Sequence, residues 1–123
     1  MKIFRLIVPV SDISLAQSFY KDLLGFEGVR VSPGRHYFDC DGVILACLDS
    51  QADGDGLISK PNPEHIYIST DELEDVFQRA KILNAANLLE IETQPWGEKS
   101  FYFNDPFGNP LCFVDSKTVF TGK

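Results

Sequence analysis

Short runs of branched and aromatic residues, separated by Gly, Pro and Asp, predict a chain of strands around two helices. The run IFRLIVPV, residues 3–10, is typical of a strand. Residues 27–50 break at Pro33-Gly34 and again at Asp41-Gly42, which predicts three strands, the last two joined as a hairpin. Between these segments, the spacing of Leu15, Phe19 and Leu23 predicts a helix with one apolar face. Residues 3–50 therefore predict the order βαβββ.

The boundaries of the first helix follow from its flanking residues. Asp12 or Ser14 is suited to cap its start, and Gly25 is suited to end it. The following segment 51–64, QADGDGLISKPNPE, is rich in Gly, Pro and Asp and has no apolar period, which predicts a linker.

The same order of elements begins again after the linker. HIYIS, residues 65–69, predicts a strand, and a stripe of Leu73, Val76, Phe77, Ala80 and Leu83 predicts a helix capped by Thr70 or Asp71. Residues 88–96, 99–105 and 109–115 predict three more strands. We therefore expect one domain over residues 1–123, made of a βαβββ module at 1–50, a linker at 51–64 and a second βαβββ module at 65–123.

Matching positions in the two modules indicate an internal repeat. Arg5 and His65 lie near the starts of the leading strands, and Gly42 and Gly108 lie in the last hairpin turns. Two such modules are expected to pair their sheets, with helices on the outer face and a cleft on the inner face.

Composition excludes several classes of protein. The 44% hydrophobic and 24% charged residues are those of an ordinary soluble globule, and a net charge of −7 without a Lys/Arg cluster argues against nucleic acid. No run is long enough to span a membrane and no signal peptide is evident, so a cytoplasmic location is expected. Three cysteines without a CxxC pair predict reduced thiols.

Two segments resemble a known family. SDISLAQSFYKDLLGF and DPFGNPL resemble motifs of the vicinal oxygen chelate superfamily, which includes glyoxalases, bleomycin resistance proteins and extradiol dioxygenases. The resemblance implies an α+β fold in which two βαβββ modules form a curved eight-stranded mixed sheet, and it implies a homodimer. Whether the cleft forms within one chain or across two is left open.

The resemblance also identifies the positions that hold a divalent metal in metal-using members: Arg5, Ala46, His65 and Cys112. Arginine carries no lone pair for a cation and alanine carries no donor atom, so two of the four positions cannot bind a metal. No cofactor is therefore expected, and a divalent metal through His65 is the alternative.

Strand alternation selects the side chains that are expected to face the cleft. We expect a ligand site made of polar and aromatic side chains on an apolar surface, with Trp96 at its rim. The predicted ligand-binding residues are Arg5, Ile7, His65, Tyr67, Trp96, Ser100, Tyr102 and Cys112.

Structural roles compete with these assignments. Arg5 is equally suited to an ion pair, Ser100 and Tyr102 to cross-strand pairing, and Trp96 to the core. Cys112 is favoured as a small buried residue, and His36 is expected to be an exposed hairpin residue.

The favoured function is binding of a small molecule in a metal-free cleft, with drug sequestration as one form of it; the negative charge would suit a cation. The alternative is a lyase or dioxygenase. It would depend on a metal held through His65, or it would be metal-free, with His65 as the base and Arg5 stabilising an oxyanion.

Overall fold

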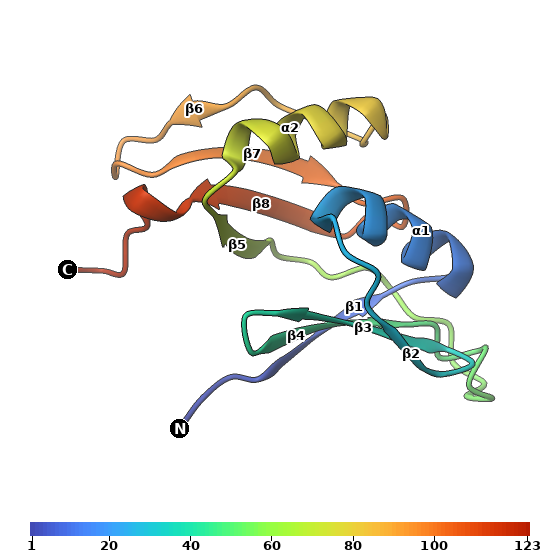
Figure 1. Ribbon diagram of the computed structural model, residues 1–123. Helices are drawn as coiled ribbons and strands as arrows, with labels where there is room; N and C mark the ends of the chain where they lie inside the picture. Colours follow the sequence, from blue (N-terminus) through green and yellow to red (C-terminus); the bar gives the residue numbers. More distant parts are fainter. The chain divides into compact units, whose positions relative to one another are not determined.

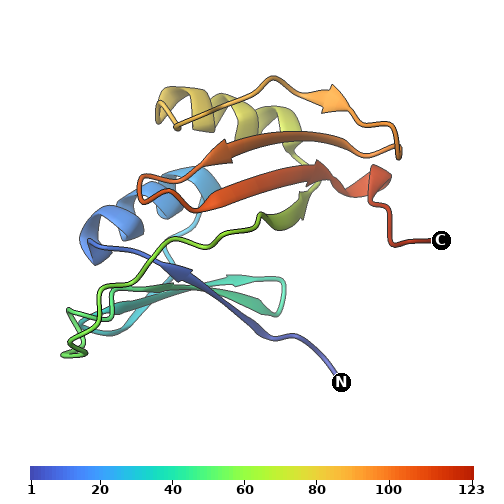
Figure 2. The same cartoon turned by 180° about the vertical axis from the view of Figure 1, so that it is seen from behind.

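The computed structural model describes residues 1–123, and the chain divides into two compact units, Met1–Asn62 and Pro63–Lys123 (Figures 1 and 2). Each unit contains one α-helix and one mixed four-stranded sheet, in the order βαβββ. The predicted α+β class and the duplicated order of elements are confirmed. The boundary between the units lies inside the segment 51–64.

The first unit is built from β1 (Arg5–Pro9), α1 (Ile13–Leu24), β2 (Val29–Ser32), β3 (Arg35–Cys40) and β4 (Val43–Leu48). Its strand order is β1-β4-β3-β2; β1 runs parallel to β4 and the other neighbours are antiparallel. The β3–β4 turn has positive φ at both Asp41 (54°) and Gly42 (92°), which suits a tight two-residue hairpin.

Helix α1 begins and ends as its flanking residues predict. The Asp12 carboxylate accepts a hydrogen bond from the Leu15 amide at 3.0 Å, and Gly25 ends the helix with φ 87°. The predicted apolar face was partly wrong, because Leu15 is 47% exposed while Tyr20 is fully buried. The helix meets the sheet through Tyr20, whose ring centroid lies 6.1 Å from that of Phe38 on β3.

His36 is not the exposed hairpin residue that its polarity suggested. It is 2% exposed and lies on the helix side of β3, with its ring 4.9 Å from the Phe38 ring. Its Nε2 lies 2.8 Å from the Glu27 carbonyl oxygen, which fixes the ring against the chain before β2. A hydrogen bond to the backbone permits this burial.

The second unit is built from β5 (Ile66–Thr70), α2 (Leu73–Ile82), β6 (Glu92–Thr93), β7 (Lys99–Asn104), β8 (Pro110–Asp115) and the 3₁₀ turn η1 (Ser116–Thr118). Its strand order, β5-β8-β7-β6, matches that of the first unit. Strand β5 starts at Ile66, so His65 immediately precedes the strand in which it was predicted.

One face of the second sheet packs against α2. Phe77 of α2 contacts Phe101 of β7 edge to face at 5.2 Å, and the rings of Phe101, Phe103 and Phe113 stack at centroid distances of 5.6–6.0 Å. Figure 1 shows α2 lying over β7, and α2 also contacts β8. Neither Thr70 nor Asp71 is the N-cap, because that position belongs to Glu72, whose side chain makes no cap hydrogen bond.

The DPFGN turn is held by the buried carboxylate of Asp105. Its Oδ1 accepts hydrogen bonds from the amides of Phe107 (2.9 Å) and Asn109 (2.8 Å), and its Oδ2 accepts one from Asn109 Nδ2 (2.8 Å). Gly108 has φ 88°, a left-handed conformation that glycine adopts without strain. This turn sets the register of β7 against β8.

Strand β6 is much shorter than predicted, with two residues in place of a run over 88–96. Ala86 forms a bridge with Asn104, and Glu92 pairs with Ser100. These two contacts are six positions apart on the segment that contains β6 but only four positions apart on β7. The two additional residues prevent a continuous ladder. None of the helices has the length and apolar character needed to cross a membrane.

Candidate functional site

The face of the second sheet opposite α2, called here the open face, carries a cluster of three rings. Tyr67 of β5 and Tyr102 of β7 are both in register with Cys112 of β8, so the three side chains point to the same face. The His65 ring lies 5.1 Å from the Tyr102 ring and 6.2 Å from the Tyr67 ring, and the two tyrosines are 6.4 Å apart. The structure thus brings together three predicted site residues.

Cys112 and Ser100 lie on the same face but are closed to solvent, at 0% and 1% exposure. Burial raises the pKa of the Cys112 thiol to about 11, although hydrogen bonds with Ser100 and Tyr102 act in the opposite direction. The pKa of Tyr102 is also raised, first by desolvation and then by Cys112 and Tyr67. Cys112 is therefore a neutral thiol at physiological pH, which agrees with its prediction as a small buried residue.

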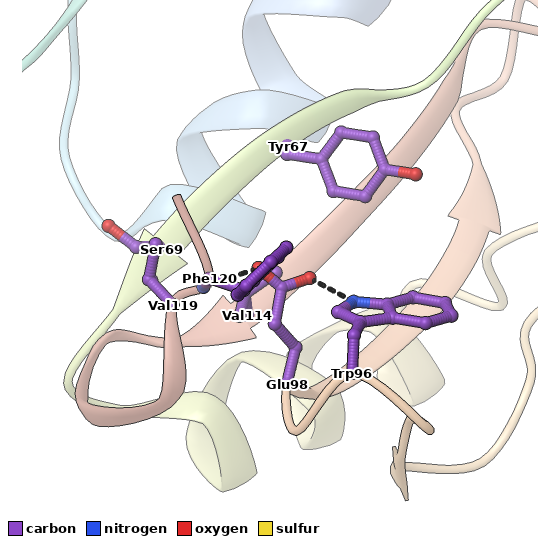
Figure 3. A pocket seen from close by; sticks show the side chains of 7 residues that line it. All are labelled: Tyr67, Ser69, Trp96, Glu98, Val114, Val119 and Phe120. Atoms are coloured by element: carbon purple, nitrogen blue, oxygen red, sulfur yellow. Dashed lines mark hydrogen bonds between the residues drawn. The ribbon is translucent and has the colours of Figure 1, made fainter. Parts of the chain in front are cut away.

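Next to this cluster the open face contains a pocket of about 460 Å³ (Figure 3). Its walls come from β5, from the chain between β6 and β7, from β8 and from the C-terminal segment. The lining residues are Tyr67, Ser69, Trp96, Glu98, Val114, Val119 and Phe120. Trp96, which the sequence predicts to lie at the rim of a ligand site, lines this pocket, and Tyr67 links the pocket to the ring cluster.

Glu98 connects two of the pocket walls. Its Oε1 accepts a hydrogen bond from Trp96 Nε1 at 2.8 Å, and its Oε2 accepts one from the Phe120 amide at 2.9 Å. Figure 3 shows the carboxylate between the indole of Trp96 and the ring of Phe120, with Tyr67 on the other side of the pocket. The carboxylate therefore fixes the positions of two aromatic walls.

The segment after β8 forms the wall that contains Phe120. Asp115, the last residue of β8, caps the turn η1, because its carboxylate accepts a hydrogen bond from the Lys117 amide at 3.0 Å. Thr118 Oγ1 then accepts a hydrogen bond from the Lys99 amide at 3.0 Å. Together with the bond from Phe120 to Glu98, this contact holds the segment beside the start of β7.

Arg5 and Ile7 belong to the first unit, where alternation was right about their common face. Arg5 is in register with Ile44, and Ile7 with Ala46, on the face opposite α1. The Arg5 guanidinium lies 5.4 Å from the centroid of the Tyr37 ring. This distance is typical of a cation–π contact, so Arg5 has an aromatic partner and makes none of the ion pairs.

The residues at the family's metal positions do not fit a divalent ion. Neither Arg5 nor Ala46 can donate a lone pair, and Cys112 is a buried thiol with a raised pKa. His65 is the remaining donor, and no group of three or more His, Cys, Asp or Glu side chains is placed to hold a metal. A zinc site with an open position uses three protein ligands.

Several pocket residues were not among the predicted site residues. Ser69 and Val114 lie two positions beyond Tyr67 and Cys112, so strand alternation places them on the same face. Glu98, Val119 and Phe120 lie outside the strands, where alternation gives no information. The pocket is therefore completed by residues whose positions depend on loop geometry.

Comparison with known proteins agrees with this architecture. Residues 2–113 match the family model described as Glyoxalase/Bleomycin resistance protein/Dioxygenase superfamily. The chain belongs to this superfamily. No curated protein matches it.

Solved structures of superfamily proteins share the fold. A lactoylglutathione lyase from Agrobacterium tumefaciens aligns with 24% identity, 94% coverage of both chains and a TM-score of 0.72. A glyoxalase-related enzyme from Fulvimarina pelagi has 18% identity, a TM-score of 0.75 and coverage of 95% of this chain and 89% of its own. A glyoxalase/bleomycin resistance protein/dioxygenase from Nocardioides has 22% identity, a TM-score of 0.72 and coverage of 100% and 87%, respectively. At these identities the likeness is one of fold.

Proposed function

We propose that this superfamily member binds a small molecule, without a metal, in the pocket on the open face of its second unit. The observation that carries the proposal is the concentration of exposed rings there: Tyr67, Trp96 and Phe120 are 57%, 47% and 50% exposed and line one pocket. Large aromatic side chains gathered at an exposed site are typical of a binding surface. The volume of about 460 Å³ is within the range of small-molecule sites, roughly 300–1,000 Å³.

The donor set supports a metal-free mode of binding. Where the superfamily's metal-using members carry ligands, this chain carries a guanidinium, a methyl group, an imidazole and a buried thiol. One exposed imidazole is insufficient for a stable divalent site. Recognition then depends on the pocket side chains alone.

Binding without chemical change, such as drug sequestration, is favoured over a lyase or dioxygenase activity. A metal-free reaction would need His65 as the base, and a catalytic imidazole is generally oriented by a hydrogen bond from its second nitrogen. The contacts of His65 are with the rings of Tyr67 and Tyr102, and none of the hydrogen bonds involves its ring nitrogens. An aromatic contact of this kind is suited to holding a ligand.

Metal analysis of protein purified without chelator tests the metal-free part. We expect far less than one equivalent of any divalent metal, and no change in melting temperature when divalent ions or EDTA are added. A stoichiometric metal that is lost in His65→Ala would overturn the proposal.

A thermal-shift screen of small molecules tests the binding part. A ligand at 100 times its Kd stabilises the native state by about 2.7 kcal/mol, which is a rise of several degrees. The rise should disappear in Tyr67→Ala and persist in Leu89→Ala, which changes an exposed residue of the same unit outside the pocket. Equal loss in both variants would contradict this site.

A further inference from the structure

Glu98 is a carboxylate without a cationic partner. The four ion pairs of the chain are Lys21–Glu27, Arg35–Asp53, Arg79–Glu72 and Lys99–Glu74. Lys99 follows Glu98 in sequence, but its ammonium lies 3.2 Å from the carboxylate of Glu74 in the first turn of α2. The negative charge of Glu98 is thus left uncompensated beside the pocket.

The hydrogen bonds of Glu98 hold its carboxylate in place without neutralising it. Each oxygen accepts one bond from a neutral N–H group, Trp96 Nε1 on one side and the Phe120 amide on the other. A carboxylate has about four lone-pair sites, so each oxygen retains capacity for a further donor. A ligand that supplies a charged donor would complete the site.

The rings around Glu98 favour the same sign of charge. Tyr67, Trp96 and Phe120 line the pocket with it; Figure 3 shows Trp96 and Phe120 on the two sides of the carboxylate and Tyr67 across the pocket from it. The faces of aromatic rings attract cations, most strongly for Trp. An anion would be repelled by Glu98, and an uncharged ligand would cover the carboxylate without compensating it.

We propose that the ligand of this pocket is an organic cation, an ammonium group on an apolar or aromatic body. The ammonium lies against Glu98 and the faces of Tyr67 and Trp96, and the apolar body contacts Val114, Val119 and Phe120. This inference rests on the proposed binding function, because it assigns the charge of the molecule that occupies the same pocket.

The experiment uses Trp96, the only tryptophan of the chain, as a fluorescent reporter inside the pocket. The full-length protein is titrated with three compounds of similar shape: phenethylammonium, 2-phenylethanol and phenylacetate. We expect phenethylammonium to change the fluorescence saturably and to bind about tenfold more tightly than the alcohol, as for a partly exposed charge pair. Added salt should weaken the binding of the ammonium.

Two variants separate the contribution of Glu98 from that of net charge. Glu98→Gln should remove most of the roughly tenfold preference for the cation and leave the part that the rings supply, whereas Asp75→Asn, which removes one negative charge from the exposed side of α2, should retain the full preference. Tyr67→Leu, at a half-exposed position, should weaken the ammonium and affect the alcohol less. Melting curves of each variant confirm folding.

The outcomes distinguish the two proposals. Equal affinity of the ammonium and the alcohol, or a preference that is undiminished in Glu98→Gln, would overturn the organic-cation assignment while leaving the binding pocket in place. Trp96 fluorescence unaffected by all three compounds at millimolar concentrations would overturn both.

Discussion

Replacing Asp105 by alanine should destabilise the second unit strongly, because this 1% exposed carboxylate satisfies three donors. The alanine variant leaves the Asn109 amide and its Nδ2 buried without this acceptor, while the Phe107 amide lies nearer to water. Each buried donor that loses its partner costs about 1–3 kcal/mol, so we expect a loss of about 3 kcal/mol in the free energy of unfolding.

The internal repeat supplies a matched control for this substitution. Asp39 lies near the end of β3, just before the corresponding turn of the first unit, and its exposed carboxylate accepts one hydrogen bond, from the Gly42 amide of that turn at 2.7 Å. Asp39→Ala should therefore cost less than about 1 kcal/mol.

Urea unfolding monitored by Trp96 fluorescence and by circular dichroism measures both losses. Because Trp96 belongs to the second unit, its transition reports directly on the unit that contains Asp105. Asp105→Asn should lie between the wild type and Asp105→Ala, since an amide oxygen still accepts but carries no charge. A cost for Asp105→Ala no larger than that for Asp39→Ala would refute the account of this turn.

Three further predictions concern thiols and packing. The pKa of Cys112 is about 11 in the native state against an ordinary value of 9.0, so between these values the native state keeps a proton that the unfolded state loses. The free energy of unfolding should therefore fall by about 1–2 kcal/mol between pH 9 and 11. Urea unfolding measures this fall, which should be smaller in Cys112→Ala. A maleimide should label Cys40 in the native protein, as followed by mass spectrometry. The reaction should be slow, because burial and the charge of Asp39 raise the pKa of this thiol. Labelling of the buried Cys47 or Cys112 without unfolding would contradict the packing. Gly28→Ala should lower the free energy of unfolding by at least about 2 kcal/mol, because φ of Gly28 is +66° and the new Cβ would lie 2.7 Å from His36 Nε2. Thermal unfolding measures this loss, and an unchanged stability would contradict this geometry.

The order of elements could be predicted because turn chemistry and apolar periodicity agree along most of this chain. Asp12 and Gly25 bound the first helix where their capping preferences place them, and Asp41-Gly42 forms the expected hairpin. Strand alternation correctly grouped Tyr67, Tyr102 and Cys112 on one face of the sheet. These features depend on residues close in sequence or on a strict period of two.

The missed features depend on tertiary contacts. His36 can be buried because its Nε2 donates a hydrogen bond to the Glu27 carbonyl oxygen, a contact that residue type does not reveal. The short β6 results from two additional residues opposite β7, which the apolar run over 88–96 conceals. Glu98 and Phe120 meet across 22 residues of sequence through a side-chain to backbone bond, so neither could be assigned to the pocket by pattern.

The C-terminal wall of the pocket has a further consequence for how binding specificity can change. The segment from η1 to Phe120 is attached to the start of β7 through Thr118 and Phe120, and the chain beyond β8 contributes no strand to the sheet. Substitutions at Val119 and Phe120, both about half exposed, alter the cavity with little effect on the core. Under the proposed binding function, selection for a new ligand would act on these positions while the sheet and its aromatic core stay the same.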